Sequence, residues 1–359
     1  MTIYSQWPSW AARLLLLLGL GLVLMEAVPH ARPQLVHLGQ PGYDDRYFQR
    51  TLVNRVTDGE DYYAAAASQS RTDSYPTAPP QVFREPALTW LLASLKTQPV
   101  RRAALLFLLA VATVTMRERF DATNIPKRLR FLAMVAQVSG FAIAWHSLQV
   151  YQHEVWAALL MAISLALYRP DRYLPSIALA LLACLVRELA LPYMLAMGAF
   201  AVWERRWREA GAWAGGMAIF LAAYALHLHM ASGLHRPGDL VSSGWLYASG
   251  WDFVVDTAKK NEILFYSPNW LVAGAIWLGM IGLAGWCDPW TRRIALIVGG
   301  YLGAFLLVGR PDNQYWGYLY SPLLPLGWVF APAALFDLMR RALPIRTHPG
   351  HAFLQRWYS

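Results

Sequence analysis

Apolar segments recur along almost the whole chain, and the first of them is long enough to cross a lipid bilayer. It covers residues 7–27 as WPSWAARLLLLLGLGLVLMEA, and about 20 apolar helical residues span the hydrocarbon core. Only 15% of the 359 residues are charged, against roughly a quarter in soluble domains. The sequence therefore predicts an all-α membrane protein with about ten transmembrane helices. The other nine segments are 101–117, 129–149, 153–168, 173–186, 189–203, 209–230, 268–286, 293–309 and 318–339.

The first segment has a competing interpretation as a cleavable signal peptide. Arg13 precedes a leucine-rich stretch of the length that such a peptide needs. The apolar run from Trp7 to Ala27 is also long enough to remain in the membrane. We favour an uncleaved first helix.

Basic residues fall in every second connection between these segments. MRERFDATNIPKRLR follows the second segment, and RPDR, ERRWR, TRR and MRRALPIR follow the fourth, sixth, eighth and tenth. Because cytoplasmic loops carry an excess of lysine and arginine, this pattern predicts a bacterial inner-membrane protein with both termini in the cytoplasm. It places residues 29–100 and 231–267 in periplasmic loops. It also accounts for the net charge of +9 without a nucleic-acid partner.

The whole chain, residues 1–359, is predicted to form one membrane domain without a separate soluble domain. Three stretches of the periplasmic loops have helix-forming or apolar residues at helical spacing, but they are too short to cross the membrane. They are EDYYAAAASQS, REPALTWLLASLK and GWDFVVDTAKKNEILFY. We expect them to form amphipathic helices on the membrane surface.

The stretch VTDGEDYYAAAASQSR, residues 56–71, concentrates acidic residues in the first periplasmic loop. In a helix, Asp58, Asp61 and Tyr62 would share one face, since they are spaced i, i+3 and i+4. A carboxylate there could accept a proton from an acceptor hydroxyl as a general base. The alternative is an acidic helix start in which Asp58 is the N-cap. The spacing leaves open whether Asp58 or Asp61 is the base.

Three arginines are candidates for binding phosphate, which a guanidinium holds with two parallel hydrogen bonds. Arg84 lies in FREPALTW, and Arg310 shares VGRPDNQYWGYLYSP with Tyr315. Arg187 and Glu188 interrupt the apolar run LLACLVRELALPYML, where ionisable residues usually face a cavity or each other. The alternatives are a lipid head-group anchor for Arg84, an internal ion pair at 187–188, and an interfacial aromatic belt around Tyr315.

Among the histidines, one is a further candidate for the substrate-binding site, and their spacing does not favour a metal site. His153, in QVYQHEVW, is predicted to line the same cavity as residues 56–71. His227 and His229, in HLHM, are two residues apart and would point in different directions on a helix. Carboxylates of the first periplasmic loop leave a divalent cation open, although no ligand set is defined. The sequence therefore predicts no certain cofactor.

The order of these features resembles the GT-C fold of multi-spanning glycosyltransferases, such as the protein O-mannosyltransferases and the lipid A aminoarabinose transferases. Members of that fold begin with one span and a large exoplasmic loop, in which an Asp precedes a Tyr or Phe by a few residues. Asp58, Tyr62 and the following AAAA match this pattern. Gly59 stands where a second acid is frequent, so Asp58 and Asp61 remain alternatives. Asp44 and Asp45, in GYDDRYF, are a third option.

Further segments are similar to later parts of the same fold, namely QVFREPALTWLLA, LLACLVRELALPYMLAMGAFAVWERR and NQYWGYLYSPLLPLGWVFAPAAL. The resemblance implies an inverting glycosyltransferase that moves a sugar from a polyprenyl-phosphate donor to a cell-envelope glycan, lipid or protein. Asp58 would deprotonate the acceptor in the periplasm. Arg84, Arg187 and Arg310 would stabilise the charge on the leaving phosphate.

Two other functions compete with this one. A transporter or flippase for a lipid-linked or small polar substrate would also explain the spans and the Arg187–Glu188 pair. Transporters usually contain related halves, and the sequence has no such repeat. A non-catalytic subunit that only binds membrane lipids is the third function, and it would tolerate the loss of the proposed base.

Overall fold

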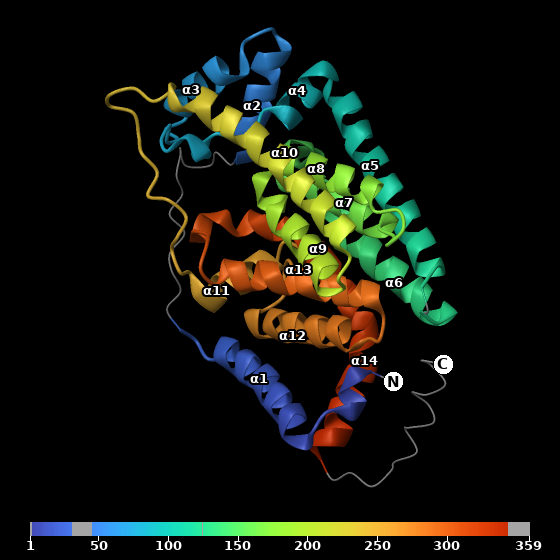
Figure 1. Cartoon of the computed structure of the whole chain (residues 1–359). Coiled ribbons are helices and arrows are strands. Elements are labelled where there is room, and N and C mark those ends of the chain that lie inside the picture. The colour runs from blue at the N-terminus through green and yellow to red at the C-terminus, as the bar shows by residue number, and fades with distance from the viewer. Residues whose placement is uncertain (1, 31–44, 124, 344–359) are drawn as a thin grey trace.

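The computed structural model describes residues 2–30, 45–123 and 125–343, and within these ranges the regular elements are all helices (Figure 1). This agrees with the predicted all-α class. The α-helices are α1 Ser9–Ala27, α2 Asp45–Thr57, α3 Tyr62–Thr72, α4 Ala87–Ser94, α5 Gln98–Asp121, α6 Lys127–Gly140, α7 His153–Leu167, α8 Leu174–Val186, α9 Leu191–Trp203, α10 Trp207–Ser232, α11 Gly250–Ala258, α12 Asn269–Gly285, α13 Pro289–Phe305 and α14 Leu324–Ala342. The 3₁₀ helices are η1 Ile3–Gln6, η2 Pro80–Val82, η3 Ala142–Trp145, η4 Ser147–Tyr151, η5 Glu188–Ala190, η6 Pro311–Leu319 and η7 Ser321–Leu323.

Each predicted apolar segment contains a helix, but the helices differ in length. Among the described residues, four helical stretches are long and apolar enough to cross a membrane. Helices of 13 residues, such as α8 and α9, rise only about 20 Å against a hydrocarbon core of about 30 Å. The structure thus supports a multi-pass membrane protein, while four spans, not ten, qualify by length and composition. The four are Ser9–Ala27, Gln98–Asp121, Trp207–Ser232 and Ser321–Ala342.

Close backbone contacts between helices depend on glycines. A Cβ atom on Gly282 would lie 1.9 Å from the carbonyl oxygen of Gly327, and one on Gly327 would lie 2.0 Å from that of Gly279. These distances leave no room for a side chain, so α12 and α14 pack backbone against backbone. Small residues allow this contact in membrane bundles, where van der Waals packing replaces the hydrophobic driving force.

One end of the bundle carries helices that follow the first span. Figure 1 shows α2, α3 and α4 gathered at the top of the view, near the start of α5. Phe48 and Leu52 of α2, Ala66 of α3 and Ala231 of α10 share a small apolar core there. The predicted helices in EDYYAAAASQS, REPALTWLLASLK and GWDFVVDTAKKNEILFY correspond to α3, α4 and α11. Helix α2 was not predicted, although Phe48, Leu52 and Val56 recur at helical spacing within the otherwise polar DRYFQRTLVNRVT.

The connections predicted to be cytoplasmic meet at the other end of α5. Arg119 Nη1 donates to the Tyr168 carbonyl at 3.3 Å, which joins the α5–α6 and α7–α8 connections. Arg293 of α13 donates to Glu204, after α9, at 2.7 Å. Near the chain ends, the backbone N–H of Thr2 donates to Asp337 of α14 at 2.9 Å. The alternation of the basic connections is therefore consistent with the arrangement of the helices.

Reporter fusions test which of these ends faces the cytoplasm. A periplasmic reporter inserted near residue 240 is expected to be active, and one near residue 207 inactive, because the connection at 207 carries ERRWR. A cytoplasmic reporter should give the reverse pattern. Equal activity of one reporter at both positions would contradict the predicted topology.

Candidate functional site

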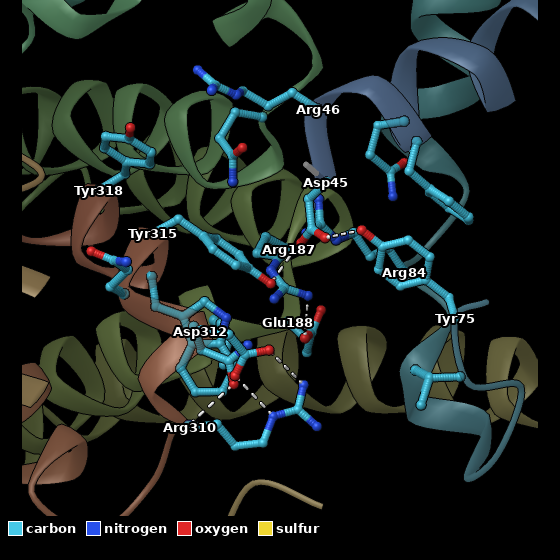
Figure 2. A pocket seen from close by; sticks show the side chains of 18 of the residues that line it. Asp45, Arg46, Tyr75, Arg84, Arg187, Glu188, Arg310, Asp312, Tyr315 and Tyr318 are labelled. Atoms are coloured by element: carbon cyan, nitrogen blue, oxygen red, sulfur yellow. Dashed lines mark hydrogen bonds and ion pairs between the residues drawn. The ribbon is translucent and has the colours of Figure 1, made fainter. Parts of the chain in front are cut away.

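A cavity of about 780 Å³, with both charged and apolar side chains in its walls, opens at the end of the bundle that carries α2 and α3. We refer to it as the first cavity. Its walls come from parts of the chain that are far apart in sequence: residues 45–84, residues 143–152, the break between α8 and α9 at 187–189, Tyr224, residues 242–245, the connection 260–266, and residues 308–318. Figure 2 shows that charged and tyrosine side chains from these parts point toward one another across it.

Asp45 lies at the wall of this cavity and accepts hydrogen bonds from two different residues. It is the first residue of α2, and its Oδ2 accepts from Arg84 Nη2 at 3.0 Å (Figure 2). The hydroxyl of Tyr75 donates to Oδ1 at 3.2 Å. Burial, followed by the charge of Asp45, raises the pKa of Tyr75, so this hydroxyl keeps its proton and remains a donor. The Asp45 carboxylate is oriented by two donors and remains 29% exposed to the cavity.

Arg84 is buried behind Asp45, just before α4. Its Nη1 lies 3.2 Å from His153 Nδ1, and its Cζ lies 5.6 Å from the ring centre of Tyr315. The hydroxyl of Tyr62 donates to the Arg84 carbonyl, which joins this segment to the start of α3. The guanidinium is therefore fixed on several sides, with Asp45 as its carboxylate partner.

Arg187 sits where the helical backbone breaks between α8 and α9. Its φ of −154° is extended, and Pro192 follows in the first turn of α9. Arg187 Nε donates to Glu154 at 2.6 Å, and Nη1 donates to Glu188 at 2.6 Å. Glu154 is completely buried, whereas Glu188 and Arg187 line the cavity. The two alternatives for this apolar run therefore occur together: Arg187 and Glu188 pair with each other, and both line the first cavity.

Arg310 forms the opposite wall of the first cavity. Its Nε donates to Asp312 at 3.1 Å, and its Nη1 donates to Ser242 at 3.0 Å. Trp245 lies beneath the guanidinium, 6.0 Å from Cζ to the ring centre. Tyr315, from the same 3₁₀ helix as Asp312, lies between Arg310 and Arg84 (Figure 2).

The structure brings most of the predicted site residues together. His153 is 1% exposed and lies behind Arg84, so it supports the wall and does not line it. The predicted residues that line the first cavity are Tyr62, Arg84, Arg187, Glu188, Arg310 and Tyr315.

Asp58 and Asp61 do not line the first cavity, and the predicted helix face that they share with Tyr62 is wrong. Helix α2 ends at Thr57 and α3 begins at Tyr62, with Gly59 between them at a φ of +98°. Both aspartates are exposed. The N-cap of α3 is Asp61, whose Oδ1 accepts from the Ala64 N–H at 3.0 Å, and not Asp58.

Asp44 and Asp45 were the third option for the general base. Asp45 lines the first cavity, while Asp44 is outside the described residues. Tyr75, which also lines the first cavity, was not predicted. The acidic pair in GYDDRYF was the available signal for Asp45, but no spacing rule links it to Arg84, 39 residues further along the chain.

The charges of the first cavity suit an anion better than a cation. Asp45, Glu188 and Asp312 each form an ion pair with an arginine. A divalent cation would have to replace these pairs and would lie beside the same guanidinium groups. Among the residues that the structure describes, the divalent cation left open by the sequence therefore gains no ligand set in this cavity, whereas a phosphate would meet arginine donors already in place.

The raised pKa of Glu85, a buried glutamate next to Arg84, can be tested through the pH dependence of stability. Glu85 is 4% exposed, and burial, followed by the charge of Glu188, raises its pKa from 4.5 to about 10. Between these values the folded protein holds a proton that the unfolded chain releases, so stability falls as the pH rises. We expect Glu85→Gln to raise the melting temperature by about 2–4 °C at pH 9 and hardly at pH 5. Glu118→Gln, at an exposed glutamate, serves as the control. An equal shift at both pH values would contradict the assignment.

No family model, curated protein or solved structure matches the chain. The fold and the first cavity therefore identify a structural class of protein but no family. It is a helical, multi-pass membrane protein with a cavity at one end of its bundle that is lined in part by arginines.

Proposed function

We propose that the chain is an inverting membrane glycosyltransferase that moves a sugar from a polyprenyl-phosphate donor to a cell-envelope glycan, lipid or protein in the periplasm. One observation carries the proposal. An oriented, accessible carboxylate, Asp45, shares a cavity with the buried guanidinium groups of Arg84 and Arg187. Glycosyl transfer from a lipid phosphate needs this pairing of a general base with phosphate ligands.

In the proposed reaction, Asp45 takes the place that the sequence suggested for Asp58 or Asp61. Its carboxylate accepts the proton of the acceptor hydroxyl as the oxygen attacks the anomeric carbon. The bond between that carbon and the phosphate oxygen breaks, and the polyprenyl phosphate leaves with the electron pair. Attack opposite the leaving group inverts the anomeric centre.

Arginines on two walls of the cavity would hold the phosphate. Arg187 is fixed through its Nε and Nη1 atoms, so its guanidinium needs no reorganisation when charge develops on the leaving phosphate. Arg310 lines the same cavity from the other wall. Its ion-pair partner Asp312 also lines the cavity, so the pair does not draw Arg310 away from it.

Aromatic and apolar side chains around the opening support a lipid-linked sugar as the substrate. Trp245 and Tyr318 line the cavity, and aromatic side chains are suited to contact with a sugar ring. Tyr266, also on the lining, is 92% exposed, and Leu246 beside Trp245 is 88% exposed. Apolar side chains this exposed at the rim provide a surface for a polyprenyl chain.

Mass analysis of membrane lipids with and without the protein tests this function. A polyprenyl-phosphate sugar is expected to accumulate in cells that lack the protein, and a surface glycan, lipid or protein is expected to lose that sugar. The chain expressed from a plasmid should reverse both changes. Unchanged lipid-linked sugars and unchanged surface glycans would contradict the proposal.

The helix break at Arg187 also favours a flippase as the second candidate, since broken helices with charged residues form binding sites in transporters. Vesicles containing the purified protein distinguish the two functions. A flippase would move the lipid-linked sugar between leaflets intact. A glycosyltransferase would release polyprenyl phosphate once an acceptor is added.

A further inference from the structure

A second cavity, of about 300 Å³, lies at the other end of α5 from the first. Arg101, in the first turn of α5, donates to Asn54 and Thr57 of α2, whereas Arg119, in its last turn, lines the second cavity. The 24 residues of α5 rise about 36 Å between these ends. The second cavity is therefore separate from the proposed reaction site.

Arg293 is the most tightly held charge of the second cavity. It is 2% exposed, and its Cζ lies 4.6 Å from the ring centres of both Tyr168 and Phe200. The two rings fix the plane of the guanidinium. Nη2 donates to both carboxylate oxygens of Glu204, at 2.7 and 2.9 Å, while buried Nη1 has no partner among the described residues.

Arg119 reaches the same cavity from α5. Its Cζ lies 5.5 Å from the ring centre of Trp290, and its Nη1 donates to the Tyr168 carbonyl. Its buried Nε has no partner in the part of the chain that the structure describes. A buried donor without an acceptor costs about 1–3 kcal/mol, and more when it is charged. Two such donors from different helices therefore call for a shared acceptor.

The carboxylates at this cavity are already engaged. Among the described residues, Glu204 and Asp288 are the acidic side chains on its wall. Glu204 pairs with both Arg206 and Arg293. Asp288 caps α13, and its Oδ1 accepts from the Trp290 N–H at 2.8 Å. The remaining N–H groups of Arg119 and Arg293 therefore have no acceptor among the described residues and are available to an acceptor that enters the cavity.

We propose that the second cavity binds a phosphate group between Arg119 and Arg293. Phosphate oxygens accept several charge-assisted hydrogen bonds at once, which suits two guanidinium groups that each have an unpaired N–H. An anionic membrane lipid and free inorganic phosphate are its two sources. Trp203 and Trp207 flank the Glu204 connection and are 85% and 66% exposed. Exposed tryptophans mark the head-group level of a membrane, which favours the lipid.

Binding measurements on the purified full-length chain test the site. Native mass spectrometry would follow the binding of phosphatidylglycerol, phosphatidylcholine and inorganic phosphate. We expect Arg119→Gln to weaken the binding of phosphatidylglycerol about tenfold, as loss of one charged hydrogen bond predicts. Arg117→Gln, which removes an exposed arginine two residues away on the same helix, should leave it unchanged.

A second variant keeps both charges and blocks the space. Ala122→Phe, at an exposed residue of the cavity wall, is expected to reduce phosphatidylglycerol binding while Arg119 and Arg293 remain. If inorganic phosphate binds and competes in an Arg119-dependent manner, free phosphate is the ligand and the site is supported. Equal binding by the natural chain, Arg119→Gln and Ala122→Phe would overturn the proposal, as would equal losses in Arg119→Gln and Arg117→Gln.

Discussion

The Asp45→Asn variant is expected to fold normally and to lose glycosyl transfer, with a turnover number about 10²–10⁴-fold below that of the natural chain. Asparagine has nearly the same shape, and its amide oxygen can still accept from Arg84 or Tyr75. It cannot accept the acceptor's proton. Release of polyprenyl phosphate by the purified protein, measured at saturating donor and acceptor, gives the turnover number. Donor affinity should change little.

Asp58→Asn and Asp61→Asn are the matched controls for this prediction. Both aspartates lie in the link between α2 and α3, outside the first cavity. Asparagine also keeps the N-cap of α3 at position 61, because its side-chain oxygen accepts the same hydrogen bond. Turnover numbers close to that of the natural chain are expected. Loss of turnover in either control, together with an active Asp45→Asn variant, would identify Asp58 or Asp61 as the general base.

Local sequence patterns predicted the arginines of the first cavity better than its carboxylate. Charges inside an apolar run, as at Arg187 and Glu188, are costly unless they face polar surroundings, and this rule needs no tertiary information. The choice of Asp58 or Asp61 assumed that one helix continues through Gly59. Asp45 was only the third option from the sequence, and it is favoured here by its contacts with Tyr75 and Arg84, which lie 30 and 39 residues away in sequence.

The number of spans shows a similar limit. Apolar composition identified where helices form, but not how long each one remains unbroken. The predicted segment 129–149 contains α6, which ends at Gly140 and is followed by η3 and η4. A Cβ atom at Gly140 would lie 2.3 Å from the carbonyl oxygen of Pro322, so this end of α6 is set by contact with the chain before α14. Such a contact has no signature within the segment itself.

Arg187→Met is expected to reduce both stability and transfer, for two separable reasons. Glu188 and the completely buried Glu154 would both lose their ion-pair partner, whereas Gln152 would remain as a donor to Glu154. Removing one member of a buried pair typically costs about 3–5 kcal/mol. The melting temperature of the purified protein in detergent should therefore fall by several degrees. The proposed phosphate ligand would be lost at the same time.

The double variant Arg187→Met with Glu154→Gln separates these two effects. Glutamine removes the buried charge and keeps an acceptor for Gln152, so much of the lost thermal stability should return. Transfer should remain low, with weakened donor binding, because no guanidinium faces the leaving phosphate from this wall. A double variant that regains both stability and turnover would assign Arg187 a purely structural role. In that case Arg84 and Arg310 would be left as the phosphate ligands of the first cavity.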